Sequence, residues 1–301
     1  MSSSPPPHTG TGRAGTALAL LSCIWGYNWI AMKQSLAYAS PTDSAAWRFV
    51  VAAIALVPVV LGQGHSLQVP RKEWWLAALL GIMLAANFTG TLWGLKLGGT
   101  GKVAVLCYTM PFWTAIFAWL FIHERMRRLQ WIAVLVAAVG LVILVDPLHL
   151  GGLAPSLLAL AAGCSWGGSV VIVKHFQGKT VSHLLTLTFW QMIICSGILF
   201  AAGSLFETPP VQWTWMFGYT LFYSGVLASA AAWMLFYFAL ARLPAGVAGL
   251  GTLATPVIGV IAAWLQFGEV PSRGELVGMA FICVGLAMLA IPPEGLRPVR
   301  R

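Results

Sequence analysis

Aromatic and polar side chains recur at helical spacing inside long apolar stretches of the sequence. Trp25 and Asn28 lie three residues apart, and Trp166 and Ser169 repeat that spacing in the second half of the chain. An amide or a hydroxyl group surrounded by hydrocarbon needs a hydrogen-bonding partner, so we expect these residues to face the interior of a helical bundle. An indole beside them can stack on a flat ligand. The pattern favours a binding cavity or, equally, hydrogen bonds between helices.

A tyrosine and two prolines add to these residues. Tyr108 lies three residues before Pro111, and Pro256 occupies the matching place in the second half. A proline removes one helix hydrogen bond, and the carbonyl that it frees must find another partner or line a wet cavity. The alternatives are a simple packing kink for the prolines and a position at the membrane interface for the tyrosine.

Other members of the predicted site stand on further apolar stretches. Trp233 and Tyr237 are four residues apart and share one helix face, whereas Asn87 and Gln191 are isolated polar residues. Each of them alone is more typical of packing than of ligand binding. Together the pattern predicts a substrate cavity lined by Trp25, Asn28, Asn87, Tyr108, Pro111, Trp166, Ser169, Gln191, Trp233, Tyr237 and Pro256.

Residues for catalysis or metal binding show no suitable spacing. The five cysteines fall inside apolar stretches without a metal-ligand pattern, and all eight carboxylates lie at or beyond the ends of those stretches. The sequence also lacks HExxH and a pair of aspartates in an apolar stretch. We therefore predict no catalytic residue, no metal and no cofactor, with an intramembrane enzyme as a poorly supported alternative.

The charged residues near the ends of apolar stretches allow two interpretations. Arg48 lies about one turn inside the second stretch. Such a residue normally extends its charge to the membrane surface, and a position near a substrate carboxylate is the alternative. Glu124 and Glu269 end two similar stretches, and we expect them to pair with nearby bases such as Arg125 and Arg273.

Composition settles the class of protein. Hydrophobic residues make up 59% of the chain and charged residues 8%, against about a quarter charged in an average soluble protein. The net charge of +9 comes mostly from connections and tails, where Lys and Arg set membrane orientation. We therefore predict an all-α polytopic membrane protein that contacts the lipid bilayer and a small-molecule substrate, and not a nucleic acid.

Ten apolar stretches are long enough to cross a membrane. Lys and Arg number twelve in the connections on the side of the N-terminus and four on the other side, which predicts an inner-membrane protein with both termini in the cytoplasm. Residues 1–14 and 292–301 are predicted to be tails, the first of them disordered. The predicted spans are Gly15–Tyr38, Asp43–Gly62, Trp74–Leu97, Lys102–Ile122, Leu129–Val145, Leu153–His175, His183–Leu205, Trp213–Arg242, Ala245–Phe267 and Glu275–Ile291.

The chain contains one unit twice. YTMPFWTAIFAWLFIHE, which starts at Tyr108, matches TLATPVIGVIAAWLQFGE, which starts at Thr252, with Pro111 opposite Pro256 at an offset of 145. Ser22–Lys33 matches Gly163–Lys174 at an offset of 141. The predicted repeats, residues 15–147 and 152–291, hold five helices each, and an odd number inverts the second copy. Inverted repeats are typical of secondary transporters, and a channel is the alternative.

The order of these motifs resembles a known family. The residues that carry the resemblance are the WG…K pattern that ends the first helix of each half (Trp25, Gly26, Lys33; Trp166, Gly167, Lys174), Trp47–Phe49, and the two Pro-to-Glu segments. They are similar to EamA-type members of the drug/metabolite transporter superfamily, and most similar to YddG-like exporters of aromatic and other amino acids. The resemblance implies a monomer with a central cavity that works by alternating access. We therefore expect an exporter of amino acids or related metabolites, with an exporter of other metabolites or drugs as the alternative.

Overall fold

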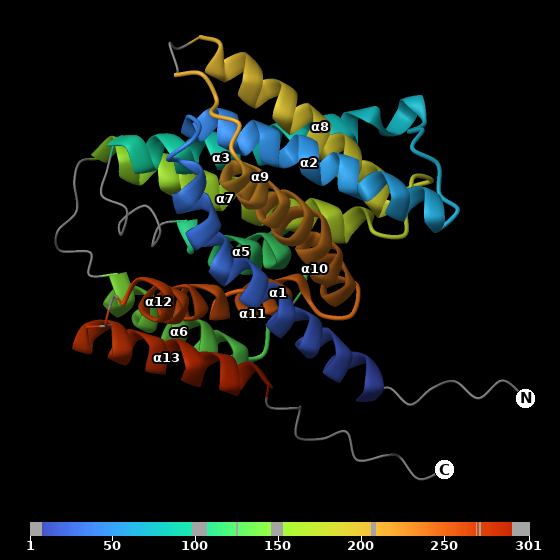
Figure 1. Cartoon of the computed structure of the whole chain (residues 1–301). Coiled ribbons are helices and arrows are strands. Elements are labelled where there is room, and N and C mark those ends of the chain that lie inside the picture. Colours follow the sequence, from blue (N-terminus) through green and yellow to red (C-terminus); the bar gives the residue numbers. More distant parts are fainter. Residues whose placement is uncertain are drawn as a thin grey trace, which may run out of the picture.

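A computed structural model describes residues 8–97, 107–124, 126–145, 153–205, 209–268, 270 and 272–290. Within these ranges every regular element is a helix (Figure 1). The elements are α1 (His8–Ser35), α2 (Pro41–Gly62), η1 (Arg71–Glu73), α3 (Trp74–Leu97), α5 (Met110–Phe121), α6 (Arg128–Val145), α7 (Leu153–Phe176), α8 (Leu184–Gly203), α9 (Trp215–Leu221), η3 (Phe222–Ala231), α10 (Ala232–Leu240), α11 (Ala245–Gly251), α12 (Ala254–Phe267) and α13 (Arg273–Ala290).

The helices are as apolar as membrane spans. Six described segments are long and apolar enough to cross a bilayer, namely Pro41–Gly62, Arg71–Thr91, Leu157–Phe176, Leu184–Gly203, Trp215–Leu240 and Ala245–Gln266. Three shorter apolar helices accompany them, at Met110–Phe121, Arg128–Ile143 and Leu276–Met288. A helix satisfies its backbone hydrogen bonds internally, which hydrocarbon demands. The protein is therefore a polytopic, all-helical membrane protein.

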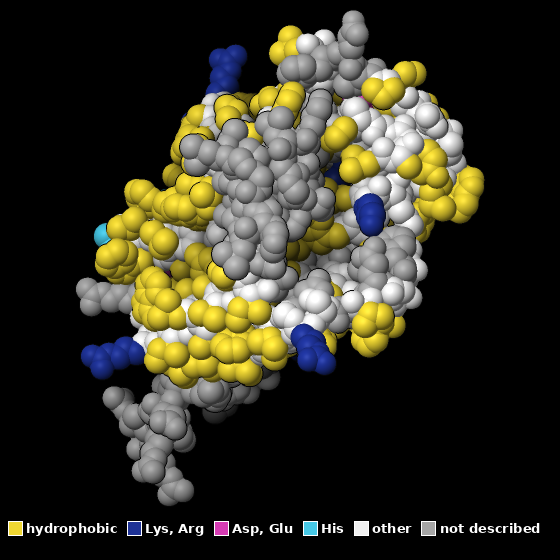
Figure 2. Space-filling view, turned by 90° about the vertical axis from the view of Figure 1, so that its left-hand side faces the viewer, with side chains coloured by type: hydrophobic (Ala, Val, Ile, Leu, Met, Phe, Trp, Pro, Cys, Tyr) yellow, Lys and Arg dark blue, Asp and Glu magenta, His cyan; other side chains and the backbone are white. Residues whose placement is uncertain are grey.

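Large apolar side chains also stand on the outside of the bundle. Phe121 is 69% exposed, Leu135 64% and Leu265 79%. Figure 2, which looks at one end of the bundle, shows hydrophobic side chains along much of its rim, with a few widely separated Lys and Arg. A soluble monomer rarely exposes apolar surface on this scale. Contact with lipid accounts for it.

Several helix boundaries differ from the predicted spans. α1 begins already at His8, within the predicted N-terminal tail. The predicted span 102–122 is represented by α5, which begins at Met110, and residues 102–106 lie outside the described ranges. The predicted span 245–267 is divided into α11 and α12, with a turn at Thr252 and Leu253.

The two prolines stand where helices start, and not in the middle of kinked helices. Pro111 is in the first turn of α5, and Pro256 is in the first turn of α12. The carbonyl of Thr252, which we expected Pro256 to leave free, accepts a hydrogen bond of 3.0 Å from the backbone N–H of Thr255. Proline is well suited to a first turn because its missing N–H would have no intrahelical partner there.

Helices from the two halves pack in matching pairs. α1 packs against α12, as α7 packs against α5, while α2 pairs with α8 and α6 pairs with α13. A Cβ added at Gly26 would lie 2.8 Å from the Ile258 Cβ, and one added at Gly167 would lie 2.7 Å from the Trp113 Cβ. Glycine is therefore required at both crossings to let the backbones approach. Figure 1 shows α6 and α13 side by side, and the start of α1 at the same end as the end of α13.

Side chains also join the ends of helices from different halves. Glu73 accepts hydrogen bonds from the backbone N–H groups of Val181 and Ser182, at 2.7 and 2.9 Å. Glu124 accepts one of 2.6 Å from the N–H of Ala245 at the start of α11. The described hydrogen bond of Glu124 is thus with a helix N-terminus, and the basic side chain of Lys174 lies near enough to interact with its charge. Arg125 and Glu269 lie outside the described residues.

A π-helix interrupts the helix that runs from α9 to α10. The Ser229 hydroxyl donates to the carbonyl of Ser224 at 2.8 Å, and the Trp25 indole N–H donates to the carbonyl of Ala228, also at 2.8 Å. Arg48 reaches the same segment. The π-helical turns are therefore held by side chains from α1 and α2. Such turns often lie at functional sites.

Candidate functional site

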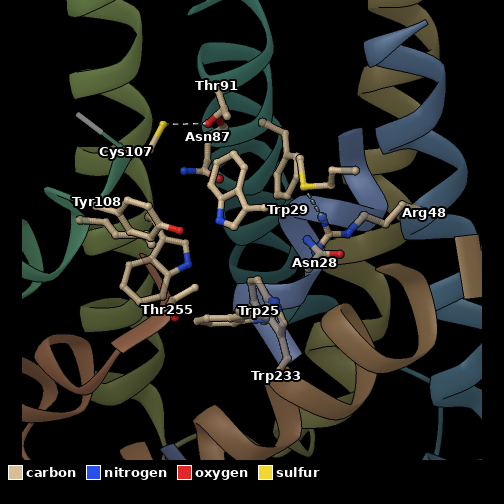
Figure 3. Close-up of a pocket in the computed structure, with 14 residues that line it drawn as sticks. Trp25, Asn28, Trp29, Arg48, Asn87, Thr91, Cys107, Tyr108, Trp233 and Thr255 are labelled. Carbon is tan, nitrogen blue, oxygen red and sulfur yellow. Dashed lines mark hydrogen bonds between the residues drawn. The ribbon is translucent and has the colours of Figure 1, made fainter. Parts of the chain in front are cut away.

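A cavity of about 120 Å³ lies between helices of both halves (Figure 3). We call it the central cavity. α1 contributes four of its lining residues, and α2, α3, α5, α7, α10 and α12 contribute others, together with the turn before α5. The lining residues are Trp25, Asn28, Trp29, Met32, Arg48, Asn87, Phe88, Thr91, Cys107, Tyr108, Met110, Trp166, Trp233 and Thr255.

Most of the predicted site residues meet here or next to it. Those that line the central cavity are Trp25, Asn28, Asn87, Tyr108, Trp166 and Trp233. Ser169, Gln191 and Tyr237 line a second space of about 10 Å³, the small cavity, which shares the three tryptophans with the central one. Pro111 and Pro256 line neither. Pro111 lies in the first turn of α5, shortly after Tyr108, and Pro256 lies in the first turn of α12, directly after Thr255.

A cluster of aromatic rings lies between the central cavity and one end of the bundle. The centroids of the Trp25 and Trp166 rings are 6.4 Å apart, and the Phe236 ring lies 6.0 and 5.4 Å from them. Beyond this cluster and Tyr237 lies the end cavity, of about 540 Å³, at the end of the bundle where α2 ends and α3 begins. The rings of Trp25, Trp166 and Phe236, which we call the aromatic barrier, thus lie between the central cavity and the end cavity. The central cavity is the better site because most of the predicted site residues and the buried Arg48 line it.

Unsatisfied polar atoms gather in these spaces. Asn28 Oδ1, the Tyr108 hydroxyl and Thr255 Oγ1 are buried in the central cavity lining, and no described residue forms a hydrogen bond with them. Gln191 Oε1 and the Tyr237 hydroxyl are in the same condition in the small cavity. Buried polar atoms normally have partners, and leaving one without a partner costs about 1–3 kcal/mol. Groups left in this way in a cavity are available to a ligand or to water.

Like the Trp25 indole, two further predicted site residues use their donors within the protein. The Asn87 amide donates a hydrogen bond of 2.8 Å to the carbonyl of Ala162, which joins α3 to α7. The Ser169 hydroxyl donates to the carbonyl of Trp166 at 2.7 Å. The hydrogen-bond donors of both side chains are therefore used between or within helices of the bundle. Asn87 still lines the central cavity.

Arg48 corrects the main expectation about charge. Its side chain does not extend to the surface, because the residue is only 6% exposed and lines the central cavity. The guanidinium Nε donates to Ser229 Oγ at 2.8 Å, and Nη1 lies 3.5 Å from the Met32 sulfur. The ring centroid of Phe88 is 5.2 Å from its central carbon. The charge does not reach the surface because the side chain points from α2 into the bundle, toward η3.

Further lining residues were not singled out from the sequence as ligand-binding. Trp29 and Met32 follow Trp25 by four and seven residues, so helical spacing places them on the same face. The Trp29 ring lies against that of Tyr108, with centroids 5.9 Å apart. Extending the Trp25 row along α1 was the available signal. For Thr255 the sequence offered no signal beyond its place before Pro256.

Comparison with known proteins agrees with this architecture. A family model described as the EamA-like transporter family matches residues 13–146 and, again, residues 153–291. The chain is 24% identical over 278 residues to the uncharacterized transporter YoaV of Bacillus subtilis (strain 168), covering 89% of this chain and 93% of that protein. It is 26% identical over 244 residues to an S-adenosylmethionine uptake transporter of Rickettsia felis, covering 80% of this chain and 79% of that protein.

A solved crystal structure shares the fold. It superposes with a TM-score of 0.77 at 19% identity and covers 94% of this chain and 98% of that chain. The likeness at this identity concerns the fold, whereas the double match to one family model spans nearly the whole sequence. The chain is a member of the EamA-like transporter family, within the drug/metabolite transporter superfamily, and carries the family's unit twice.

Proposed function

We propose that the protein is an inner-membrane secondary transporter that exports neutral or aromatic amino acids, or related small metabolites, by alternating access. The observation that carries the proposal is the central cavity, which both halves line with indoles and unpartnered polar atoms. An aromatic barrier stands on one side of it. Stacking rings and hydrogen-bonding groups suit a small molecule with a flat or apolar body.

The proposal includes two inverted repeats of five helices, residues 15–147 and 152–291, in a monomer with both termini in the cytoplasm. The matching helix pairs support it, because α1 meets α12 in the way that α7 meets α5. The glycines at these two crossings, Gly26 and Gly167, support it as well. Two similar halves of opposite orientation can exchange conformations and so open the cavity to each side in turn.

A different metabolite, moved in the opposite direction, is the second candidate. The relative from Rickettsia felis is named for S-adenosylmethionine uptake. S-adenosylmethionine contains a flat heterocycle that indoles such as Trp25 and Trp166 can stack on. A substrate panel therefore has to include it beside the amino acids.

Counterflow in liposomes that contain only the purified protein tests the proposal. We expect saturable, ligand-specific exchange of an aromatic or neutral amino acid. Trp166→Ala and Tyr108→Ala should lower it about tenfold, because each removes buried stacking area from the cavity wall. Trp215→Ala, at a position 79% exposed, is the matched control and should stay within about twofold of the parent protein.

Three results would redirect the proposal. Absence of counterflow with every amino acid would end the amino-acid version, and exchange of S-adenosylmethionine alone would favour the second candidate. Flux that does not saturate would indicate a channel.

A further inference from the structure

We propose that Arg48 binds the anionic group of the transported molecule, so that the substrate class is a carboxylate with an apolar or aromatic body. The inference rests on the proposed function and narrows it. Figure 3 shows the guanidinium directed from α2 into the central cavity, beside Asn28 and across from Tyr108 and Thr255. A planar guanidinium matches the two oxygens of a carboxylate.

The Arg48 guanidinium has more N–H donors than the described residues offer acceptors. A guanidinium carries five N–H donors. In the described part of the chain, Arg48 gives one to Ser229 Oγ and directs Nη1 at the weakly accepting sulfur of Met32. Its other close neighbours are the rings of Phe49 and Phe88, which accept no conventional hydrogen bond, and the Cys195 thiol on α8, which is at most a weak acceptor. An oxygen-rich anion would satisfy the remaining donors.

The described residues offer this cation no counterion. None of their carboxylates forms an ion pair with Arg48, and its hydrogen bonds go to a hydroxyl and a sulfur. A buried charge without a partner is costly, and proteins normally pair it. The chain keeps the charge in the cavity nonetheless. A substrate that carries its own carboxylate would supply the missing partner each time it binds.

The repeat shows that the fold itself does not need the charge. Gln191 on α8 is placed as Arg48 is on α2. A Cβ added at Gly225 would lie 2.9 Å from the carbonyl oxygen of Arg48, and one added at Gly81 would lie 3.2 Å from that of Gln191. The two helix crossings are therefore alike, yet a neutral amide serves the second one. The cation belongs to the central cavity, whereas its neutral counterpart lines the small cavity.

The rest of the lining suggests a second polar contact. Asn28 Oδ1 lies in the central cavity as a buried acceptor without a described partner, close to Arg48 in Figure 3. It can accept a hydrogen bond from an ammonium group. With the body of the molecule against the Trp29 and Tyr108 rings, the cavity suits an α-amino acid in its zwitterionic form.

Ligand binding to the purified protein in detergent tests the assignment without transport. The probes are L-phenylalanine, 3-phenylpropionate and 3-phenylpropanamide, followed by quenching of tryptophan fluorescence. The last two differ only in a carboxylate against a neutral amide. In the parent protein we expect both carboxylates to bind at least about tenfold more tightly than the amide, as charged hydrogen bonds do.

Four variants separate binding from support of the fold. Arg48→Gln copies the residue of the second half and should reduce the carboxylate preference to within about twofold. Arg48→Lys keeps a charge and should retain part of the preference. Ser229→Ala removes the described partner of Nε and should keep the preference. Arg71→Gln removes the same charge from an exposed position and should behave as the parent does.

The outcomes discriminate between the two proposals. Full carboxylate preference in Arg48→Gln, or none in the parent protein, would overturn the assignment. Equal loss of all three ligands in Arg48→Gln and Ser229→Ala would also overturn it, because Arg48 would then only hold η3. Should Arg48→Gln fail to fold, the parent ratio and Arg48→Lys still decide. Carboxylate preference without counterflow would contradict the proposed function and leave the anion site standing.

Discussion

His183 shows how one side chain ties a helix start to its protonation state. Its Nδ1 accepts a hydrogen bond of 3.3 Å from the backbone N–H of Leu185 in the first turn of α8. Its ring stacks on that of His65, with centroids 3.8 Å apart. Burial and the neighbouring His65 lower the pKa of His183 below its usual value. Only an unprotonated Nδ1 can accept, so the cap requires the neutral ring.

Acidification should therefore weaken this end of the bundle. The unfolded chain binds the proton more readily than the folded one, so the stabilisation is fully present above the ordinary pKa of about 6.5. It is lost as pH falls through that value toward the lower pKa of the folded protein. His183→Asn keeps a good N-cap without titrating in this range. We expect the melting temperature of the parent protein to fall more than that of His183→Asn between about pH 7.5 and 5.5; parallel curves would contradict this.

At the scale of residues, the sequence indicated which side chains lie at the cavity more reliably than it indicated the role of each. Helical spacing and the requirement for partners in hydrocarbon brought Trp25, Asn28 and Trp166 to one cavity. The same logic misjudged Arg48, because snorkelling is a statement about an isolated helix. Whether a cation reaches the surface depends on what the neighbouring helix presents, and here Ser229 presents an acceptor.

At the scale of elements, close crossings depend on residues without side chains. Gly167 lies where α7 meets α5, and an added Cβ would come within 2.7 Å of the Trp113 Cβ and 2.8 Å of the Thr114 backbone nitrogen. Neither atom is the end of a flexible side chain. Any larger residue there must push the two helices apart.

Gly167→Ala should accordingly destabilise the protein by roughly 1–3 kcal/mol, as overpacking usually does. Gly197→Ala on α8 is the matched control, because a Cβ there meets nothing within 4 Å. Alanine also favours the helix by up to about 1 kcal/mol over glycine. Thermal unfolding followed by fluorescence would compare them. Equal melting temperatures for the two variants would show that the crossing is looser than described.

The helices themselves were largely predictable, and their interruptions were not. Long apolar stretches identify a span without any knowledge of its neighbours, as for α2 and α8. The π-helical turns of η3 depend on contacts from α1 and α2. Near the break between α11 and α12, the Ser22 hydroxyl of α1 donates to the carbonyl of Gly251 at 3.5 Å. The prolines marked the helix starts, but they were interpreted as interior residues that free a carbonyl for the cavity or, alternatively, kink the helix, because a first turn and a helix interior look alike in sequence.

At the scale of the molecule, charge should decide orientation. The start of α1 and the end of α13 lie at the same end of the bundle. The connections and tails on that side hold twelve Lys and Arg, against four on the other side. We therefore expect that end to face the cytoplasm. A fluorescent protein fused after Arg301 should fluoresce, and alkaline phosphatase fused there should be inactive. Active phosphatase would reverse the assignment.

The sequence also predicted two similar halves, but it could not predict which space is open. Trp25, Trp166 and Phe236 close together on one side of the central cavity. A chain that exchanges conformations has one sequence for all of them. The arrangement of the aromatic barrier is thus a property of one conformation and not of the residue pattern.

The π-helix bears on how the halves have diverged in length. Gly81 and Gly225 make matching contacts, on Ile194 and Val51, and lie 144 positions apart, whereas Pro111 and Pro256 lie 145 apart. The stretch from Gly225 to Pro256, which includes most of η3, is therefore one residue longer than its counterpart in the first half. A π-helical turn is one place where a helix can absorb an insertion while its flanking faces keep their direction. Duplicated halves can thus change length within the bundle as well as in loops.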